Sequence, residues 1–143
     1  MKLYLHVGYP KTGTTAIQHF LYNNRECLKE AGYLYPDIGI CDKAHHSLAI
    51  SILEIDLPTT KHIRKYNPVC LRDSLVDSIN SSKCKNVVIS SEFFNLYAQS
   101  NFVRKKKTLV KFFKDYEITI ILYLRHPIDF LESSYSQQIK NIH

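Results

Sequence analysis

The sequence predicts an α/β fold, a three-layer domain in which a parallel β-sheet lies between helices. Three observations lead to this prediction. Short apolar runs alternate with helical patterns along the chain, which is typical of parallel strands joined by helices. Two of these runs lead through a polar turn directly into a helix. Residues 1–143 amount to one domain, which is long enough to bury a hydrophobic core.

The apolar residues 3–7 predict the first strand, and a polar loop joins it to an amphipathic helix. The loop reads Gly8-Tyr9-Pro10-Lys11-Thr12-Gly13-Thr14-Thr15. Its two glycines are separated by four residues, nearly as in a Walker A motif. Thr14 stands where that motif has its lysine, and the loop's only lysine is Lys11. Because the start of a helix offers unpaired N–H donors and a partial positive charge, the loop is expected to hold a phosphate group, with its cation placed differently from that of an ATPase.

Helical patterns and short strand signals alternate up to residue 67. The first helix should end at Gly32, and its apolar stripe comprises Ile17, Phe20, Leu21 and Leu28. Residues 34–35 are a short strand candidate, and a second helix is expected at about 45–54. The polar stretch 57–67, bounded by two prolines, is expected to be a loop.

A third helix, another buried strand and a fourth helix are expected at about 68–82, 86–90 and 102–115. The residues expected to face the core are Leu71, Leu75, Val76 and Ile79 in the third helix, and Leu109, Phe112 and Phe113 in the fourth. The fourth helix should expose Lys107, Lys111 and Lys114. Its basic run at 104–107 fits either a solvated helix face or a rim that attracts an anionic acceptor such as a polysaccharide.

The apolar, β-branched run 117–124 does not alternate with polar residues, so it predicts a buried strand. It ends at Arg125, and Pro127 suits the first turn of a following helix. One face of that helix is apolar and comprises Ile128, Leu131, Tyr135, Ile139 and Ile142. Ser133 follows Arg125 by eight residues. A guanidinium and a hydroxyl are suitable donors to a terminal phosphate, and parallel sheets place their ligands at the C-terminal ends of strands.

The loop from Pro10 to Thr15 closely resembles the 5'-phosphosulfate loop of sulfotransferases that use 3'-phosphoadenosine 5'-phosphosulfate, a family with a domain like that of the P-loop proteins. The segment Leu-Arg-His-Pro with Ser133 resembles the family's 3'-phosphate site. The resemblance implies transfer of a sulfuryl group from this donor to a hydroxyl of a carbohydrate or small molecule, without a metal. It implies donor binding by Pro10, Lys11, Thr12, Gly13, Thr14, Thr15, Arg125 and Ser133, with Lys11 beside the oxygen that bridges phosphate and sulfur.

Sulfuryl transfer also needs a general base for the acceptor hydroxyl, and the sequence leaves three candidates. His45 and His46 follow the short second strand, and histidine has the better starting pKa. Glu92 follows the strand at 86–90, where burial would have to raise its pKa. His46 is the first choice, with His45 or Glu92 as substitutes. Each also has a purely structural interpretation, as a residue at the start of a helix.

The composition is that of an ordinary globular protein, with 45% hydrophobic and 22% charged residues. The net charge of +6 suits an anionic nucleotide and an anionic or sugar acceptor. The basic run lacks interleaved aromatic residues, so no nucleic-acid partner is expected. No segment predicts a membrane span or a signal peptide, which favours a cytoplasmic protein. The four cysteines lack metal or redox spacing and are expected to be reduced and mostly buried.

Domains of the resembling family usually continue well beyond the arginine–serine helix. The chain is therefore expected to represent the donor-binding part of such a domain, with most of the acceptor side missing. Two other classes compete with this interpretation. A P-loop kinase or NTPase would need a lysine at position 14, where Thr14 stands, and an acidic metal ligand at a strand end. The other alternative is a catalytically silent nucleotide-binding module.

Overall fold

The computed structural model describes residues 1–9, 11–95 and 101–140, and these contain a four-stranded sheet whose neighbouring strands are all parallel. Its strands, in the spatial order β2-β3-β1-β4, are β1 (Lys2–Val7), β2 (Tyr33–Leu34), β3 (Asn86–Ser91) and β4 (Glu117–Ile121). The α-helices of the described residues are α1 (Thr14–Asn23), α2 (Arg25–Glu30), α3 (His46–Ile52), α4 (Pro68–Ser82), α5 (Phe102–Phe112) and α6 (Pro127–Lys140). The predicted α/β fold with a parallel sheet is confirmed.

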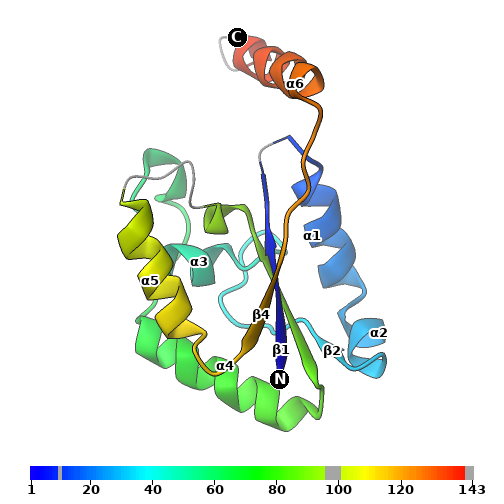
Figure 1. Cartoon of the computed structure of the whole chain (residues 1–143), viewed down its shortest axis with the longest axis vertical. Coiled ribbons are helices and arrows are strands. Elements are labelled where there is room, and N and C mark those ends of the chain that lie inside the picture. The colour runs from blue at the N-terminus through cyan, green and yellow to red at the C-terminus, as the bar shows by residue number, and fades with distance from the viewer. Residues whose placement is uncertain (10, 96–100, 141–143) are drawn as a thin grey trace.

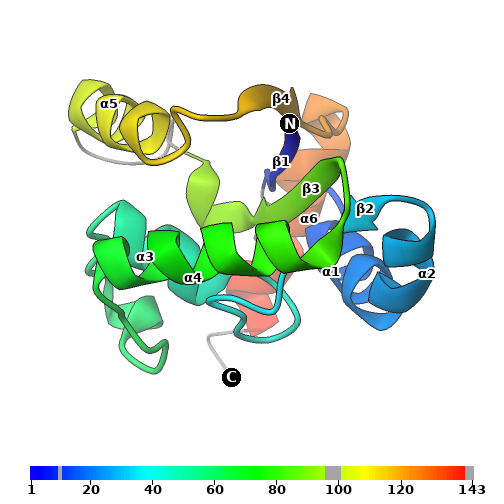
Figure 2. The ribbon, with the colours of Figure 1, turned by 90° about the horizontal axis from the view of Figure 1, so that it is seen from below.

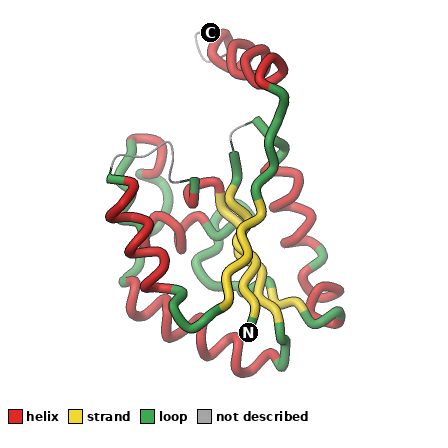
Figure 3. Tube along the Cα trace, in the orientation of Figure 1, coloured by secondary structure: helices red, strands yellow, loops and turns green. Residues whose placement is uncertain are grey.

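Helices lie on both sides of the sheet. Helices α3, α4 and α5 cover one face, and α1 and α2 lie on the other (Figures 1 and 2). The strands run side by side through the middle of the molecule (Figure 3). Strand β1 is central, with Leu5 opposite Ile89 of β3 and Ile120 of β4.

The hydrophobic core lies between the sheet and the layer formed by α3, α4 and α5. Leu3 and Leu5 of β1 point into it because alternate residues of a strand share a face. The inward residues predicted for α4 and α5 are buried there, except that Val76 is only partly buried. The buried residues that confirm the prediction are Leu71, Leu75, Ile79, Leu109, Phe112 and Phe113.

The predicted first helix differs from the observed one. It is broken at Asn24 into α1 and α2, and it ends, as predicted, before Gly32, which has a φ of 85°. The residues of α1 that are buried are Thr14 and Gln18, whereas Phe20 of the predicted apolar stripe is 62% exposed. Ile17, Leu21 and Leu28 of the stripe are half-buried, so the prediction is wrong at Phe20.

Strand β4 is not the buried strand that the apolar run predicted. It ends at Ile121, and Ile120 and Leu124 are 63% and 77% exposed. Only β1 pairs with β4 in the described sheet, so β4 is an edge strand. Of its side chains, that of Ile118 packs against the core. An apolar run shows that a strand is suited to burial. Whether the strand is buried depends on which other elements cover it.

Three smaller predictions were also tested. Helices α3 and α5 are shorter than expected, and residues 57–67 form a loop apart from the single turn η1 (Pro58–Thr60). All four cysteines are free, but Cys27 and Cys70 are exposed on α2 and α4, so the expectation of mostly buried thiols is wrong. None of the described helices combines the length and apolar character that crossing a bilayer requires.

Candidate functional site

The loop after β1 lies against the end of β3, and glycine is required at position 8 for this contact. A Cβ atom added to Gly8 would lie 2.6 Å from Cγ2 of Thr14 and 2.9 Å from Cβ of Glu92. The N–H group of Gly8 donates to the carbonyl oxygen of Ser91 (3.5 Å). Within the loop, the Thr12 hydroxyl donates to the carbonyl oxygen of Tyr9 (2.7 Å). The loop is thus folded back on itself and fixed beside Glu92.

The loop leads into helix α1, whose first backbone N–H groups are unpaired within the described part of the chain. Helix α1 begins at Thr14 after Gly13, whose φ of 80° suits glycine, and no side chain caps it. The carbonyl oxygen of Gly13 accepts from the N–H groups of Ala16 and Ile17. The N–H groups of Thr14 and Thr15 have no partner among the described residues. Together with the positive end of the helix dipole, they favour an anion at this position.

The second predicted motif meets this loop in space. Nη1 of Arg125, which follows β4, donates to the carbonyl oxygen of Lys11 (3.1 Å), 114 residues earlier in the chain. Both residues line one cleft of about 700 Å³. The cleft is lined by Lys11, Gly13, Thr14, Thr15, Leu57, Glu92, Phe93, Asn95, Arg125 and Gln137. Loop donors and two cationic side chains therefore surround one space.

Helix α6 turns Phe130 and Gln137 toward the loop, and its apolar face lies on the exposed side. The ring of Phe130 lies 5.7 Å from that of Tyr9, and Gln137, two turns later, lines the cleft. The predicted apolar face is exposed at Ile128, Leu131, Tyr135 and Ile139, and Ile142 lies outside the described residues. In Figure 1, α6 lies beyond the carboxyl ends of the strands, so the sheet does not cover that face.

Ser133 and Thr12, two described residues of the predicted donor site, are not among those that line the cleft. Ser133 is half-buried on α6, one helical turn before Gln137 and on the same side of the helix. Thr12 uses its hydroxyl within the loop. Pro10 lies outside the described residues.

His45 is held as a structural residue at the end of β3. Its side chain is fully buried, and Nδ1 accepts from the N–H group of Ser90 (3.1 Å). Its Nε2 therefore carries the proton and donates to the carbonyl oxygen of Pro36 (2.9 Å). Burial lowers the pKa of His45 to about 4. With both ring nitrogens engaged, His45 has no free nitrogen to accept a proton from a substrate.

His46 lies behind the cleft rather than in it. Its Nδ1 is 2.8 Å from Oγ of Ser91, and its ring packs edge-on against Phe93, which lines the cleft. Burial lowers the pKa of His46, an effect that nearby Asp42 opposes. Its Nε2 has no hydrogen-bond partner within the described part of the chain. His46 would need a path past Phe93 to reach a ligand.

Glu92 is the candidate base that lines the cleft. It opens the single turn η2 (Glu92–Phe94) directly after β3, and the cap of this turn is Ser91, whose Oγ accepts from the N–H group of Phe93. The Glu92 side chain is exposed in the cleft, and partial desolvation raises the pKa of its carboxyl. A carboxylate with a raised pKa accepts a proton more readily near neutrality.

Sequence reasoning missed several residues at this site. Leu57, Asn95 and Gln137 line the cleft, yet no motif marks them, because they come from a loop, a turn and the side of α6 opposite its apolar face. His6 was also missed. It is buried, its Nδ1 lies 2.6 Å from Oγ of Ser90, and burial lowers its pKa. The polar pair Ser90-Ser91 at the end of an apolar strand was the available signal for this network.

In the described residues, no three His, Cys, Asp or Glu side chains are grouped so that they could hold a metal ion. Comparisons of the chain with protein-family models, with curated proteins and with solved structures found no match.

Proposed function

We propose that the protein binds 3'-phosphoadenosine 5'-phosphosulfate in the cleft and transfers its sulfuryl group to an acceptor hydroxyl. The observation that carries this proposal is the meeting of two motifs, since Arg125 donates to the carbonyl oxygen of Lys11 and both line the cleft. The donor carries phosphates at its 3' and 5' positions, so it needs two groups of donors within one nucleotide's length. The loop with Lys11 offers one group and Arg125 the other.

The proposed step is an in-line displacement at sulfur. The acceptor oxygen forms a bond to sulfur while the bond between sulfur and the 5'-phosphate oxygen breaks, and adenosine 3',5'-bisphosphate leaves. Negative charge grows on the leaving phosphate, where the ammonium of Lys11 and the N–H groups of Thr14 and Thr15 would stabilise it. The two N–H groups are fixed by the backbone of α1, which is the condition for a large electrostatic effect on the rate.

Glu92 is our proposed proton acceptor, in place of His46. Of the three predicted candidates, Glu92 alone lines the cleft, and the pKa of its carboxyl is raised. His46 lies behind Phe93, and both ring nitrogens of His45 are engaged. The acceptor's proton would pass to the Glu92 carboxylate as the new oxygen–sulfur bond forms.

Calorimetric titration with three nucleotides tests the proposal. The protein should bind adenosine 3',5'-bisphosphate more tightly than adenosine 5'-phosphate, and magnesium should not strengthen either. ATP that binds more tightly than both, and only with magnesium, would indicate a kinase or NTPase instead. Lys11→Ala should weaken binding of the bisphosphate, whereas Lys85→Ala, an equal charge change at the amino end of β3, should not.

A further inference from the structure

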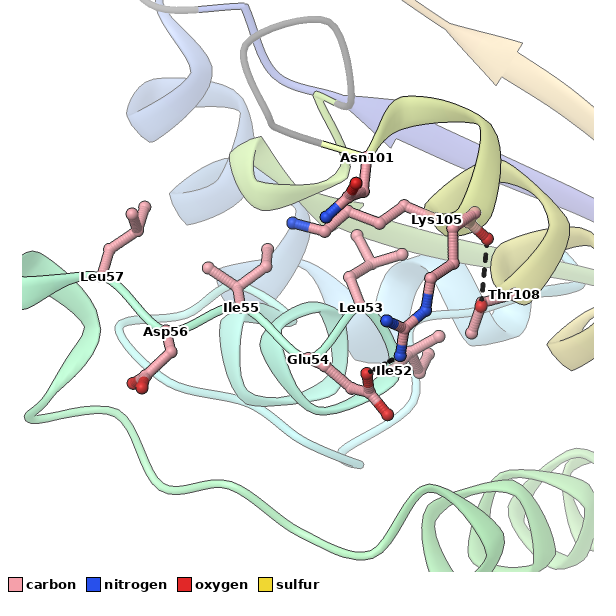
Figure 4. Close-up of a pocket in the computed structure, with 10 residues that line it drawn as sticks. Ile52, Leu53, Glu54, Ile55, Asp56, Leu57, Asn101, Lys105 and Thr108 are labelled. Carbon is pink, nitrogen blue, oxygen red and sulfur yellow. Dashed lines mark hydrogen bonds and ion pairs between the residues drawn. The ribbon is translucent and has the colours of Figure 1, made fainter.

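A second cleft adjoins the proposed donor cleft. It has a volume of about 290 Å³ and lies between the chain that follows α3 and the first turns of α5. Figure 4 shows Asn101 and Lys105 reaching over an apolar floor that includes Leu53 and Ile55. Leu57, which is 46% exposed, lines both clefts. A ligand that occupies the donor cleft at Glu92 could therefore continue over Leu57 toward α5.

The acidic residues of the second cleft are already paired. Glu54 forms an ion pair with Arg104 (2.7 Å), and Asp56 forms one with Lys65 (3.2 Å). Helix α5 itself contains no acidic residue. The ion pairs therefore neutralise the negative charges of this cleft. The remaining basic side chains of α5 make the surface positively charged.

A basic surface continues from the second cleft along α5. A shallow hollow shares Asn101, Arg104 and Thr108 with the second cleft and is also lined by Lys107 and Lys111. These two lysines lie one helical turn apart and are exposed. No ion-pair partner for either occurs among the described residues. Their charges are thus available to an external anion.

The apolar residues on this surface do not suit nucleic acid. Phe112 and Phe113 are buried, Phe102 of the hollow is half-buried, and the exposed apolar side chain that lines the hollow is Val103. Proteins that bind single-stranded nucleic acid stack the bases on exposed aromatic rings. A basic row with exposed aliphatic groups offers charge without stacking, which suits a polymer that carries charges but no bases.

We propose that the acceptor is a linear acidic glycan that lies along this path. Its reacting sugar would enter the donor cleft at Glu92, the next sugars would cross Leu57, and the following ones would lie beside Lys107 and Lys111. The identification as acceptor rests on the proposed function, but the binding of the glycan does not. The basic row would also steer a polyanion toward the cleft.

Binding of a ten-sugar oligogalacturonate, with one carboxylate per sugar, tests this proposal without any nucleotide present. The protein should bind it and should not bind a neutral dextran of equal length. The double variant Lys107→Ala/Lys111→Ala should weaken binding about fivefold or more, the effect of losing two exposed ion pairs. The matched control Lys29→Ala/Lys85→Ala removes the same charge elsewhere and should change binding less than about twofold. Circular dichroism verifies that each variant is folded.

Equal losses in both double variants, or no loss in either, would overturn the proposal, because binding would then reflect only net charge. Tighter binding of a ten-nucleotide oligothymidylate, with the same dependence on the two lysines, would also overturn it in favour of nucleic acid. Failure of the nucleotide titrations would refute the proposed donor and leave the result with the glycan unaffected. The two proposals therefore fail separately.

Discussion

At the scale of single residues, Gly8 determines how closely the loop approaches Glu92. A methyl group there would meet both Thr14 and the β-carbon of Glu92. We expect Gly8→Ala to destabilise the protein by about 1–3 kcal/mol, as overpacking does, and to weaken binding of adenosine 3',5'-bisphosphate. Urea unfolding and calorimetry measure the two effects.

Gly32→Ala is the matched control for this prediction. Gly32 has a positive φ, which Gly8 does not, but open space surrounds its Cβ position and it lies far from the loop in the sequence. Its substitution should cost about 1 kcal/mol of stability through backbone strain and leave nucleotide binding unchanged. A Gly8→Ala protein that binds nucleotide as well as Gly32→Ala does would contradict the loop geometry.

The buried His45 makes stability depend on pH. Its pKa falls from 6.5 to about 4 on folding, so the unfolded chain binds the proton more readily. The stability that depends on a neutral His45 is therefore fully present above about pH 6.5, and it is lost as the pH falls toward about 4. Between about pH 7 and pH 5 the loss from this residue should amount to about 2 kcal/mol.

Urea unfolding at these two pH values measures this loss. In His45→Asn, the loss of stability between about pH 7 and pH 5 should be smaller by about 2 kcal/mol. This difference does not depend on how stable the variant is at about pH 7. His19→Asn changes an exposed histidine of α1 and should leave the fall as in the wild type. An unchanged fall in His45→Asn would show that this residue is not the neutral, buried group described above.

At the scale of elements, the sequence predicted where helices and strands occur better than which way they face. Periodicity identified α4, α5 and α6 because it reports an apolar stripe, and α4 and α5 bury theirs. It did not show where α6 lies, because no pattern within a helix shows what lies opposite it. The same reason explains β4, whose apolar run is typical of a central strand although β4 lies at the edge.

The exposed face of α6 gives a test at this scale. Leu131 is 65% exposed, so Leu131→Asn should change the free energy of unfolding by less than about 0.5 kcal/mol. Leu75→Ala, which truncates a buried side chain of α4, should lower the free energy of unfolding by about 2–5 kcal/mol. A loss in Leu131→Asn comparable to that in Leu75→Ala would mean that the apolar face of α6 is covered in solution. Urea unfolding of the two variants decides between these results.

At the scale of the whole molecule, topology brings distant motifs together. The loop after β1 and Arg125 after β4 could be expected to meet, because parallel strands end at one edge of the sheet and β1 and β4 are neighbours. The choice among the candidate bases was not predictable in this way. All three candidates lie close to the end of β3. His45 and His46 differ from Glu92 in that their ring nitrogens form hydrogen bonds within the protein. Such contacts leave no pattern in a sequence.

The central claim is that the loop and Arg125 bind the two ends of one nucleotide. The measurement that tests it most directly is calorimetric titration of Arg125→Ala with adenosine 3',5'-bisphosphate and with adenosine 5'-phosphate. Arg64→Ala, which removes the same charge from an exposed site beside Tyr66, is the control. Binding of the bisphosphate should weaken by about 1.5–3 kcal/mol in Arg125→Ala alone, the scale of a charged hydrogen bond, while binding of the monophosphate stays nearly unchanged. Equal losses for both nucleotides would contradict the claim, because Arg125 would then act only by holding the loop through the carbonyl oxygen of Lys11.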